Sequence, residues 1–514
     1  MSTKATTLAF APVPPVVPAH LAWRAGVRLA AFGVLALIGL ALLAGHRISD
    51  MGAAYTASLF VVALCLPAWC CFRRSSADAS GHVDLLQPGA VVAIWFYLYT
   101  VVPALHVWLE LDYQSIWVDP TWPPQRVFHI SLLLSLVGLA AFGIGYRSHD
   151  PRPIPTRSAA ATAAPARWPV LATGTALIML VVGFGFKLRH LVLLGGLTPS
   201  TFLYLSPTYV SESGIKTSGV FTFFESWFDW GALLLLFWAL TTGRRRFLAV
   251  AVIILAFVLA YLLSGKRSAI IPFILYPLTW LHYLKRRVSV RRGLLYGGAT
   301  VALVTFLLFM RTLGPLFATK GVDLSSVPAD IALEPAKFYL NSPELAMFDM
   351  TMLAVEDREP LLHTINGPFW GGLKYNFAPA AYIIPRFLWP GKPTFTDLGQ
   401  VFFQRAVGER EDVGFTVGIV GALYLFGGLV GVFVGMLIVG WLFRWVYERI
   451  RPWNRSLASV FVYGILLWIL FLFLRFGALG FTILFALQFE LAGVIVALVV
   501  LQATRAHSLT PNRP

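Results

Sequence analysis

Charged residues are scarce in this chain, at 12% of its 514 residues. A soluble domain usually carries about twice that share, roughly 25%. The hydrophobic share is 58%, and the apolar residues fall in repeated runs. Scarce charge together with long apolar runs excludes a string of soluble domains. It predicts an all-α integral membrane protein that crosses the bilayer several times.

Cysteines and the common cofactor motifs are also scarce. The chain has three cysteines, Cys65, Cys70 and Cys71, without a CxxC spacing or a neighbouring pattern of histidine ligands. A zinc or redox site is therefore not expected. The sequence has no Asp-x-Asp pair for a metal-bound nucleotide sugar, no GxxxxGK[ST] loop and no HExxH. We expect neither a metal nor a cofactor, and no ATP-driven pump.

Acidic residues are fewer than basic ones, which gives a formal net charge of +16. Such a charge can indicate nucleic-acid binding. Here, however, the positive residues cluster between apolar runs, as membrane topology requires. Nucleic acid is therefore not an expected partner.

Apolar windows long enough to cross a bilayer as helices recur along the chain. They lie near 26–44, 52–71, 88–108, 129–146, 168–187, 221–241, 247–264, 268–284, 294–311, 416–441, 456–475 and 480–502. The first window is long for a signal peptide and lacks a convincing cleavage site, so we expect it to be retained. The pattern predicts about twelve transmembrane helices.

The connections between these windows carry lysine and arginine unevenly. When the N-terminus is placed in the cytoplasm, five successive connections on that side are basic, at 73–74, 147–167, 244–246, 285–292 and 444–455. The positive-inside rule therefore predicts that both termini are cytoplasmic.

This topology divides the chain into five parts. We expect a cytoplasmic tail at 1–25, spans one to nine at 26–311, a large periplasmic loop at 312–415, spans ten to twelve at 416–502, and a cytoplasmic tail at 503–514. The large loop has no run of about 20 apolar residues, so it cannot be another simple span.

Two motifs place cations on the outer side, where they are disfavoured. Lys266 and Arg267 lie in the turn Ser-Gly-Lys-Arg-Ser at 264–268. Glycine exposes backbone N–H groups there, and a helix begins at the same point, so the turn suits a phosphate. Arg386 and Lys392 lie in the proline-rich run at 384–393, which fixes their positions. The alternative for both motifs is that the cations contact lipid headgroups at the membrane surface.

Further basic residues fall on the same side. We expect them to contribute to an outward-facing site for an anionic ligand: Lys187, Arg189, His190, Arg311, Lys374, Arg405 and Arg475.

Candidate proton acceptors in the large loop are Glu344, Asp349 and His363. Ser342 and Pro343 predict the start of a helix that continues to about Val355, in which Glu344 could equally be a first-turn partner of the helix dipole. A lone histidine is more often structural than catalytic. Three carboxylates fall within predicted spans, where a charge is normally paired or functional: Glu225, Asp229 and Glu490.

Together these residues resemble the Wzy-type polymerases of O-antigen and related exopolysaccharides, the oligosaccharide repeat unit polymerases. The resemblance rests on the Ser-Gly-Lys-Arg-Ser turn at 264–268, the long outer loop, and its Pro-Arg-Phe-Leu-Trp-Pro-Gly-Lys-Pro segment at 385–393. The glycine-rich opening of the next span at 417–431 also fits. The resemblance covers roughly residues 85–500.

The resemblance implies a GT-C-like bundle in the inner membrane of a bacterium, with its active site facing the periplasm. The substrates would be oligosaccharides linked to undecaprenyl diphosphate, and a chain-length regulator remains an open partner. The cations imply the following diphosphate ligands: Lys266, Arg267, Arg311, Arg386, Lys392 and Arg475. The implied catalytic set is Arg267, Arg386, His363 and Glu344. Aromatic side chains that could stack on sugars are Trp370, Tyr375, Tyr382 and Trp389.

Three other functions remain open. An O-antigen ligase shares the lipid-diphosphate donor. A transporter or flippase of lipid-linked sugars would line a path through the bundle with its cations, and the sequence has few deep cations. A membrane scaffold would not explain so many ionisable groups in one loop.

Overall fold

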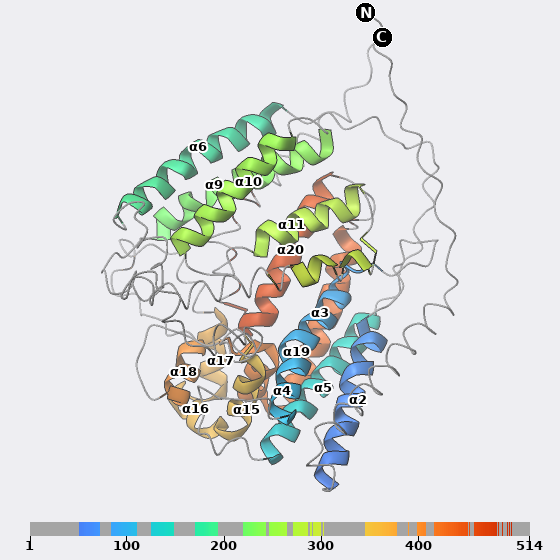
Figure 1. The fold of residues 1–514 in the computed structure, drawn as a ribbon. Helices are drawn as coiled ribbons and strands as arrows, with labels where there is room; N and C mark the ends of the chain where they lie inside the picture. Colours follow the sequence, from blue (N-terminus) through green and yellow to red (C-terminus); the bar gives the residue numbers. More distant parts are fainter. Residues whose placement is uncertain are drawn as a thin grey trace, which may run out of the picture.

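The computed structural model describes residues 51–71, 84–109, 125–148, 170–193, 219–242, 246–264, 271–285, 345–377, 398–407, 416–450 and 457–477, with a few isolated positions elsewhere. Every regular element within these ranges is helical, and none is a strand. The predicted all-α class is therefore confirmed for the described part of the chain. Figure 1 shows a bundle of long helices with a group of short helices at one end.

Most of the predicted apolar windows coincide with described helices. In chain order the long helices are α2 (Met51–Cys71), α3 (Pro88–Phe96) continued by η1 (Tyr97–Val101) and α4 (Val102–Leu109), α5 (Gln125–Arg147), α6 (Val170–Leu193), α9 (Gly219–Thr242), α10 (Arg246–Ser264), α11 (Ile271–Trp280) continued by η4 (Leu281–Lys285), α19 (Gly418–Ile450) and α20 (Leu457–Phe476). Windows 26–44, 294–311 and 480–502 lie wholly or largely outside the described residues.

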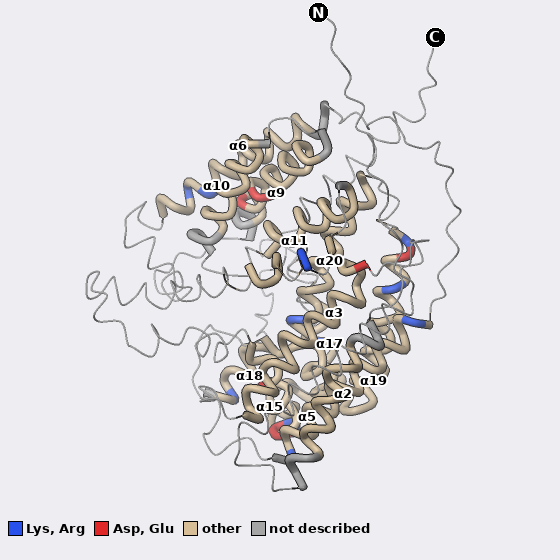
Figure 2. Tube along the Cα trace, turned by 45° about the vertical axis from the view of Figure 1, so that its right-hand side comes forward, with Lys and Arg blue, Asp and Glu red and all other residues tan. Residues whose placement is uncertain are grey.

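Six of the described helices are long and apolar enough to cross a membrane. Two shorter apolar helices, Tyr55–Pro67 and Phe247–Ala260, accompany them. Charged side chains are few along these helices, as Figure 2 shows. The chain is therefore a helical membrane protein, while the count of about twelve spans stays a prediction.

Close helix pairs depend on glycine. The backbone of Gly145 in α5 lies against Leu437 of α19, and Gly440 of α19 lies against Phe142 of α5. Further along, Gly138 faces Val432. The residue numbers of the contacts increase along both helices together, so α5 and α19 run in the same direction. A Cβ at Gly145 or Gly440 would collide with a backbone carbonyl, which fixes small residues at the crossing.

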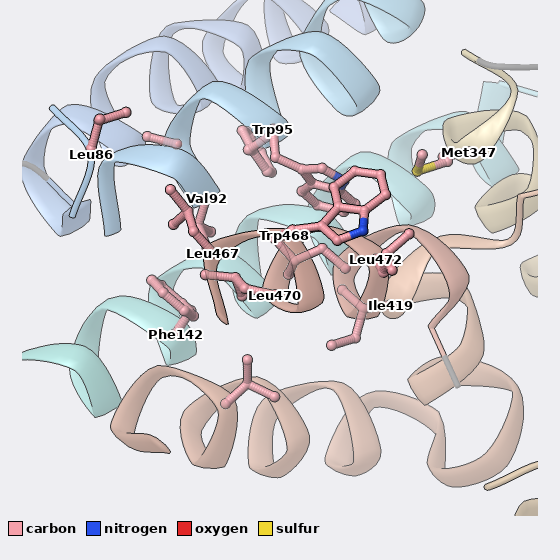
Figure 3. Close-up of a cluster of buried hydrophobic side chains, with 14 of the residues drawn as sticks. Leu86, Val92, Trp95, Phe142, Met347, Ile419, Leu467, Trp468, Leu470 and Leu472 are labelled. Atoms are coloured by element: carbon pink, nitrogen blue, oxygen red, sulfur yellow. The ribbon is translucent and has the colours of Figure 1, made fainter. Parts of the chain in front are cut away.

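Large apolar side chains fill the centre of the bundle. Trp468 of α20 is 2% exposed and lies among residues from several helices, as Figure 3 shows. Trp280 of α11 is fully buried, and its ring stacks on Phe461 of α20 at 5.5 Å. This packing holds α11 and α20 together. Between helices in lipid there is no hydrophobic driving force, so close van der Waals packing of side chains takes its place.

Helix α19 is not one straight rod. Gly428 has φ 59° and ψ −151°, a conformation that only glycine adopts readily. A Cβ on Gly435 would lie 2.6 Å from Cδ2 of Leu423, although twelve residues of straight helix span about 18 Å. The chain therefore folds back at Gly428 into a short arm, 418–427, and a long arm, 429–450. The window 416–441, which the sequence predicts to be a single crossing, is divided by this reversal.

Four short helices form what we call the cap: α15 (Met347–Glu356), α16 (Arg358–Thr364), α17 (Pro368–Phe377) and α18 (Leu398–Val407). Their apolar faces share a core with the short arm of α19 through Val417, Ala422 and Leu425. The cap is thus an ordered unit built onto the hairpin, at one end of the bundle (Figure 1). Helix α15 begins at Met347, with Ala346 at its N-cap, which is later than the start predicted at Ser342.

Candidate functional site

A buried arginine lies beneath the cap. Arg475 occupies the last turn of α20 and is 8% exposed. Its Nη2 donates to Oγ1 of Thr416 at 3.5 Å. Gly477, with φ +67°, follows at once and packs against the Gly418 carbonyl and Ala422. The end of α20 therefore meets the start of the short arm, and we call this meeting point the junction.

Helix α15 of the cap closes the junction from a third side. The Met347 side chain lies 3.5 Å from the Cβ position of Gly418, and Thr351 Oγ1 lies 3.4 Å from that of Gly421. Asp349 lies between these two contacts in the chain and is 8% exposed. The junction thus brings one buried cation, a helix start and the Met347–Thr351 face of α15 together, while Asp349 is two residues from Met347 and lies on a different face of α15.

The electrostatics of the junction favour a negative ligand. The short arm begins at Gly418, and the start of a helix carries partial positive charge and free backbone N–H groups. Arg475 adds a full charge in a fork that matches phosphate oxygens. Arg475 also lies about 18 Å along α20 from Tyr463, which approaches the opposite end of the bundle. Arg475 is thus buried in the last turn of α20, and a buried cation in a membrane protein is costly to place there.

Several other outer cations have carboxylate partners. Lys187 Nζ lies 3.0 Å from Asp229 Oδ1, and His190 Nδ1 lies 3.0 Å from Glu225 Oε1. These two pairs form a ladder between α6 and α9. In this structure Lys187 and His190 each face a carboxylate, and their expected part in an outward-facing anion site stays a prediction.

Arg405 is paired in the same way inside the cap. Its Nε lies 2.7 Å from Asp357 Oδ2, and this bond raises the pKa of the Arg405 guanidinium. The neighbouring Arg358 donates from Nε to the Tyr424 carbonyl of the short arm at 3.2 Å. Arg405 therefore ties α18 to the start of α16, while its predicted role at an anion site stays a prediction.

The remaining predicted site residues fall into two groups. One group lies outside the described residues: Lys266, Arg267, Arg311, Glu344, Tyr382, Arg386 and Lys392. In the other group, His363 is exposed in the last turn of α16, while Trp370 and Trp389 are 68% and 40% exposed. Tyr375 is 7% exposed and packs against Phe426, a position that suits packing better than stacking on a sugar.

Sequence reasoning missed a polar cluster at the opposite end of the bundle. Asp84, just before α3, accepts hydrogen bonds from the hydroxyls of Tyr283 and Tyr447, both at 2.6 Å. The Leu86 N–H donates to its other oxygen at 2.9 Å, and His282 Nε2 lies 3.0 Å from that oxygen. We call these residues the Asp84 cluster. They come from three helical segments far apart in sequence.

The polar groups of the Asp84 cluster form their hydrogen bonds with one another and with the neighbouring backbone. His282 Nδ1 accepts from the Val288 N–H at 3.0 Å, so in a neutral ring the proton lies on Nε2 and faces Asp84. Burial alone would raise the pKa of Asp84, but the bonds from His282, Tyr283 and Tyr447 together hold it below 3.8. A carboxylate satisfied by four donors has no capacity left for a substrate. The cluster therefore joins helix ends.

The Asp84 cluster also fixes the direction of the helices. Helix α3 starts beside it and α20 approaches it near its own start, where the Tyr463 hydroxyl bonds to the Leu86 carbonyl. Segments η4 and α19 approach it near their ends, through Tyr283 and Tyr447. This order agrees with the alternation expected from the basic connections. The cap and the junction lie at the other end.

Metal ligands do not gather among the described residues, where no group of three or more His, Cys, Asp or Glu side chains could hold an ion. A family model described as a domain of unknown function (DUF8712) matches residues 373–487. That stretch begins within α17, contains α18, the hairpin and α20, and continues past the end of α20 at Phe476, so it includes Arg475. No curated protein and no solved structure matches the chain.

Proposed function

We propose that the protein is a membrane glycosyltransferase that joins oligosaccharide repeat units carried on undecaprenyl diphosphate, at the membrane face that bears the cap. The observation that supports this most is the junction, where buried Arg475 meets the start of the short arm beneath an ordered cap. The positive-inside bias of the connections would make this the periplasmic face of a bacterial inner membrane.

The chemistry asked of the protein is displacement of a lipid diphosphate. A hydroxyl of the acceptor sugar attacks the anomeric carbon of the donor glycan, and a new C–O bond forms. The bond from that carbon to the diphosphate breaks, and the diphosphate leaves with the electron pair. The hydroxyl proton passes to a base, for which Asp349, Glu344 and His363 are the candidates.

Arg475 would stabilise the charge that develops on the departing diphosphate, which a fixed cation does well in a site that excludes water. The candidates at the 264–268 turn and the 384–393 run, namely Lys266, Arg267, Arg386 and Lys392, would bind the same diphosphate or that of the acceptor. Arg311 remains a further candidate on the same reasoning. The substrate would reach these groups through the bilayer, since its lipid remains in the membrane.

A reconstitution tests the proposal. Purified protein in nanodiscs receives lipid-diphosphate-linked repeat units as the sole substrate, and the products are separated by length. The proposal predicts a ladder of chains that remain on the lipid. Folded protein that forms no chain from a panel of repeat units would contradict it. Transfer of ready-made chains onto lipid A core, without extension, would favour the ligase instead.

A transporter of lipid-linked sugars is the second candidate, and the broken helix α19 favours it. Transporters often build their sites from interrupted helices near the middle of the membrane. Among the described helices, α19 has a fold-back at Gly428, but we see no symmetry-related partner for it. Movement of a labelled lipid-linked sugar across vesicles, without extension, would identify the protein as a transporter.

A further inference from the structure

Helix α17 has two contrasting faces. Its inner face is small and buried, since Gly371 lies against Ile365 and Gly372 faces Phe426 of the short arm. Its outer face is large and apolar, because Phe369 is 67% exposed and Trp370 is 68% exposed. Leu373, 37% exposed and one turn further on, lies on that outer face. A soluble cap would not be expected to present such a face to water.

The position of α17 along the bundle is defined by the hairpin. Phe426, which α17 contacts, immediately precedes the reversal at Gly428. Helix α17 therefore lies beside the tip of the hairpin, at the level where the long arm of α19 begins.

The other end of the long arm carries an aromatic pair. Trp441 and Trp445 are 42% and 43% exposed, and their rings stack at 6.4 Å. Exposed tryptophans on a spanning helix are typical of the membrane–water interface. From Trp445 to the start of the long arm is about 24 Å of helix, and the tip with α17 lies just beyond it. That separation approaches the hydrocarbon thickness of a bilayer, about 30 Å.

The surface between these two levels is continuously apolar. The exposed large side chains on the long arm are Leu429, Val430, Phe433, Val434, Ile438, Trp441, Leu442 and Trp445. Phe369 and Trp370 thus lie on the exposed face of α17 at the level of the second interface.

We propose that α17 is an interfacial anchor, with Phe369, Trp370 and Leu373 embedded in the lipid of the leaflet on the cap side. The occupant of this face is lipid and not a sugar, because Phe369, Trp370 and Leu373 form an apolar surface in which the Phe369 and Trp370 rings meet edge-on at 5.3 Å, and Lys374 at its border suits the lipid headgroups. The inference does not depend on the proposed function. The anchor would hold the cap, and with it helix α15 over the junction, at a fixed height relative to the bilayer.

Spin labelling tests the anchor. In a background with Cys65→Ser, Cys70→Ser and Cys71→Ser, a nitroxide is attached through Trp370→Cys and the protein is placed in lipid vesicles. Collisions with oxygen, which concentrates in lipid, are compared with collisions with a water-soluble nickel chelate. Val430→Cys, at a position 71% exposed on the long arm, is the lipid-facing control. Glu359→Cys, where the native side chain is 83% exposed on the cap, is the water-facing control.

The proposal predicts that the ratio of oxygen to nickel collisions at position 370 matches that at 430 and exceeds that at 359. A ratio equal to that at 359 would show a water-facing helix. Low collision rates with both reagents would show that another protein surface covers α17. Either result would overturn the proposal.

A second measurement needs no substitution. The native chain is illuminated in vesicles that contain lipid with a photoreactive acyl chain, and labelled peptides are identified by mass spectrometry. We expect label on peptides from 368–377 as well as on those from 429–450. Label on the long arm alone would contradict the anchor, even if the cysteine variants failed to fold.

Discussion

The two ends of the bundle use buried charge in opposite ways. At one end, Asp84 accepts four hydrogen bonds from donors that the fold supplies, and His282 has both ring nitrogens engaged. At the other end, Arg475 lies where three separately built elements meet: α20, the short arm of α19 and α15 of the cap. The first arrangement is closed, and the second is assembled around a cation that suits an added anion.

The comparison contrasts a buried charge that stabilises the fold with one that we propose to bind a ligand. A polar network whose members satisfy one another makes a structure rigid and specific. The ladder between α6 and α9 is less complete, since Lys187 and His190 each face a carboxylate but the ring nitrogens of His190 are buried without a hydrogen bond. Identifying an intramembrane charge is therefore not enough to locate a site.

The largest effect on stability is expected at the Asp84 cluster. Asp84→Ala leaves the hydroxyls of Tyr283 and Tyr447 and the His282 N–H buried without their acceptor. We expect a loss of about 3–5 kcal/mol in stability, seen as a much lower melting temperature of the protein in detergent. Asp84→Asn, which keeps one acceptor oxygen, should lose less. Unchanged melting of the alanine variant would contradict the role given to the cluster.

The next effect concerns catalysis at the junction. Arg475→Ala should slow chain extension by about 10²-fold, the usual result of removing one stabilising group from a developing charge. Arg475→Lys keeps the charge but loses the forked guanidinium, so its rate of chain extension should lie between those of the wild type and Arg475→Ala. Arg405→Ala is the control, because that exposed cap residue is bound to Asp357. Rates are measured on equal amounts of folded protein, and equal rates in all four proteins would remove Arg475 from the site.

A smaller effect is expected at the reversal of α19. Gly428→Ala places a side chain at φ 59° and ψ −151°, which costs about 1–3 kcal/mol. The matched control is Gly427→Ala, because a Cβ at either position meets nothing within 4 Å and, of these two glycines, Gly428 is the one with a positive φ. Thermal melting of the two variants separates backbone strain from steric contact. Equal melting would mean that the hairpin is not strained there.

The smallest effect is the pH dependence of the stability that the Asp84 cluster contributes. The pKa of Asp84 is lowered below its ordinary value of 3.8 in the folded protein, so its contribution to stability is fully present above that pH. The contribution is lost only as the pH falls through the folded pKa. Melting recorded between pH 7 and pH 3 should therefore show an acid-dependent loss below about pH 4 that Asp84→Asn reduces. A loss centred near neutral pH would contradict the charged carboxylate.

The sequence predicted well those features that depend on neighbouring residues. Windows such as 88–108 and 129–146 coincide with helices, because about 20 apolar residues in a row have few alternatives in a bilayer. It also predicted that the loop before α19 carries structure of its own, although the N-cap of α15, Ala346, lies four residues beyond the predicted cap at Ser342. Local signals of this kind need no knowledge of the fold.

Features that depend on distant contacts could not be predicted in the same way. Asp84 and Tyr447 are 363 residues apart, and nothing near either one indicates the other. The fold-back of α19 had a visible cue in Gly427 and Gly428, but a glycine pair is also common in straight spans. For the ladder, the cue was the spacing of Lys187 with His190 and of Glu225 with Asp229, at the facing ends of consecutive spans.

Binding of a lipid diphosphate at the junction is the most direct test of the account. Undecaprenyl diphosphate is titrated into wild-type protein, Arg475→Ala and Asp84→Asn in nanodiscs, at a temperature where all three are folded. We predict weaker binding by Arg475→Ala and wild-type affinity for Asp84→Asn. Equal affinity of wild type and Arg475→Ala would contradict the assignment of the functional site to the cap end.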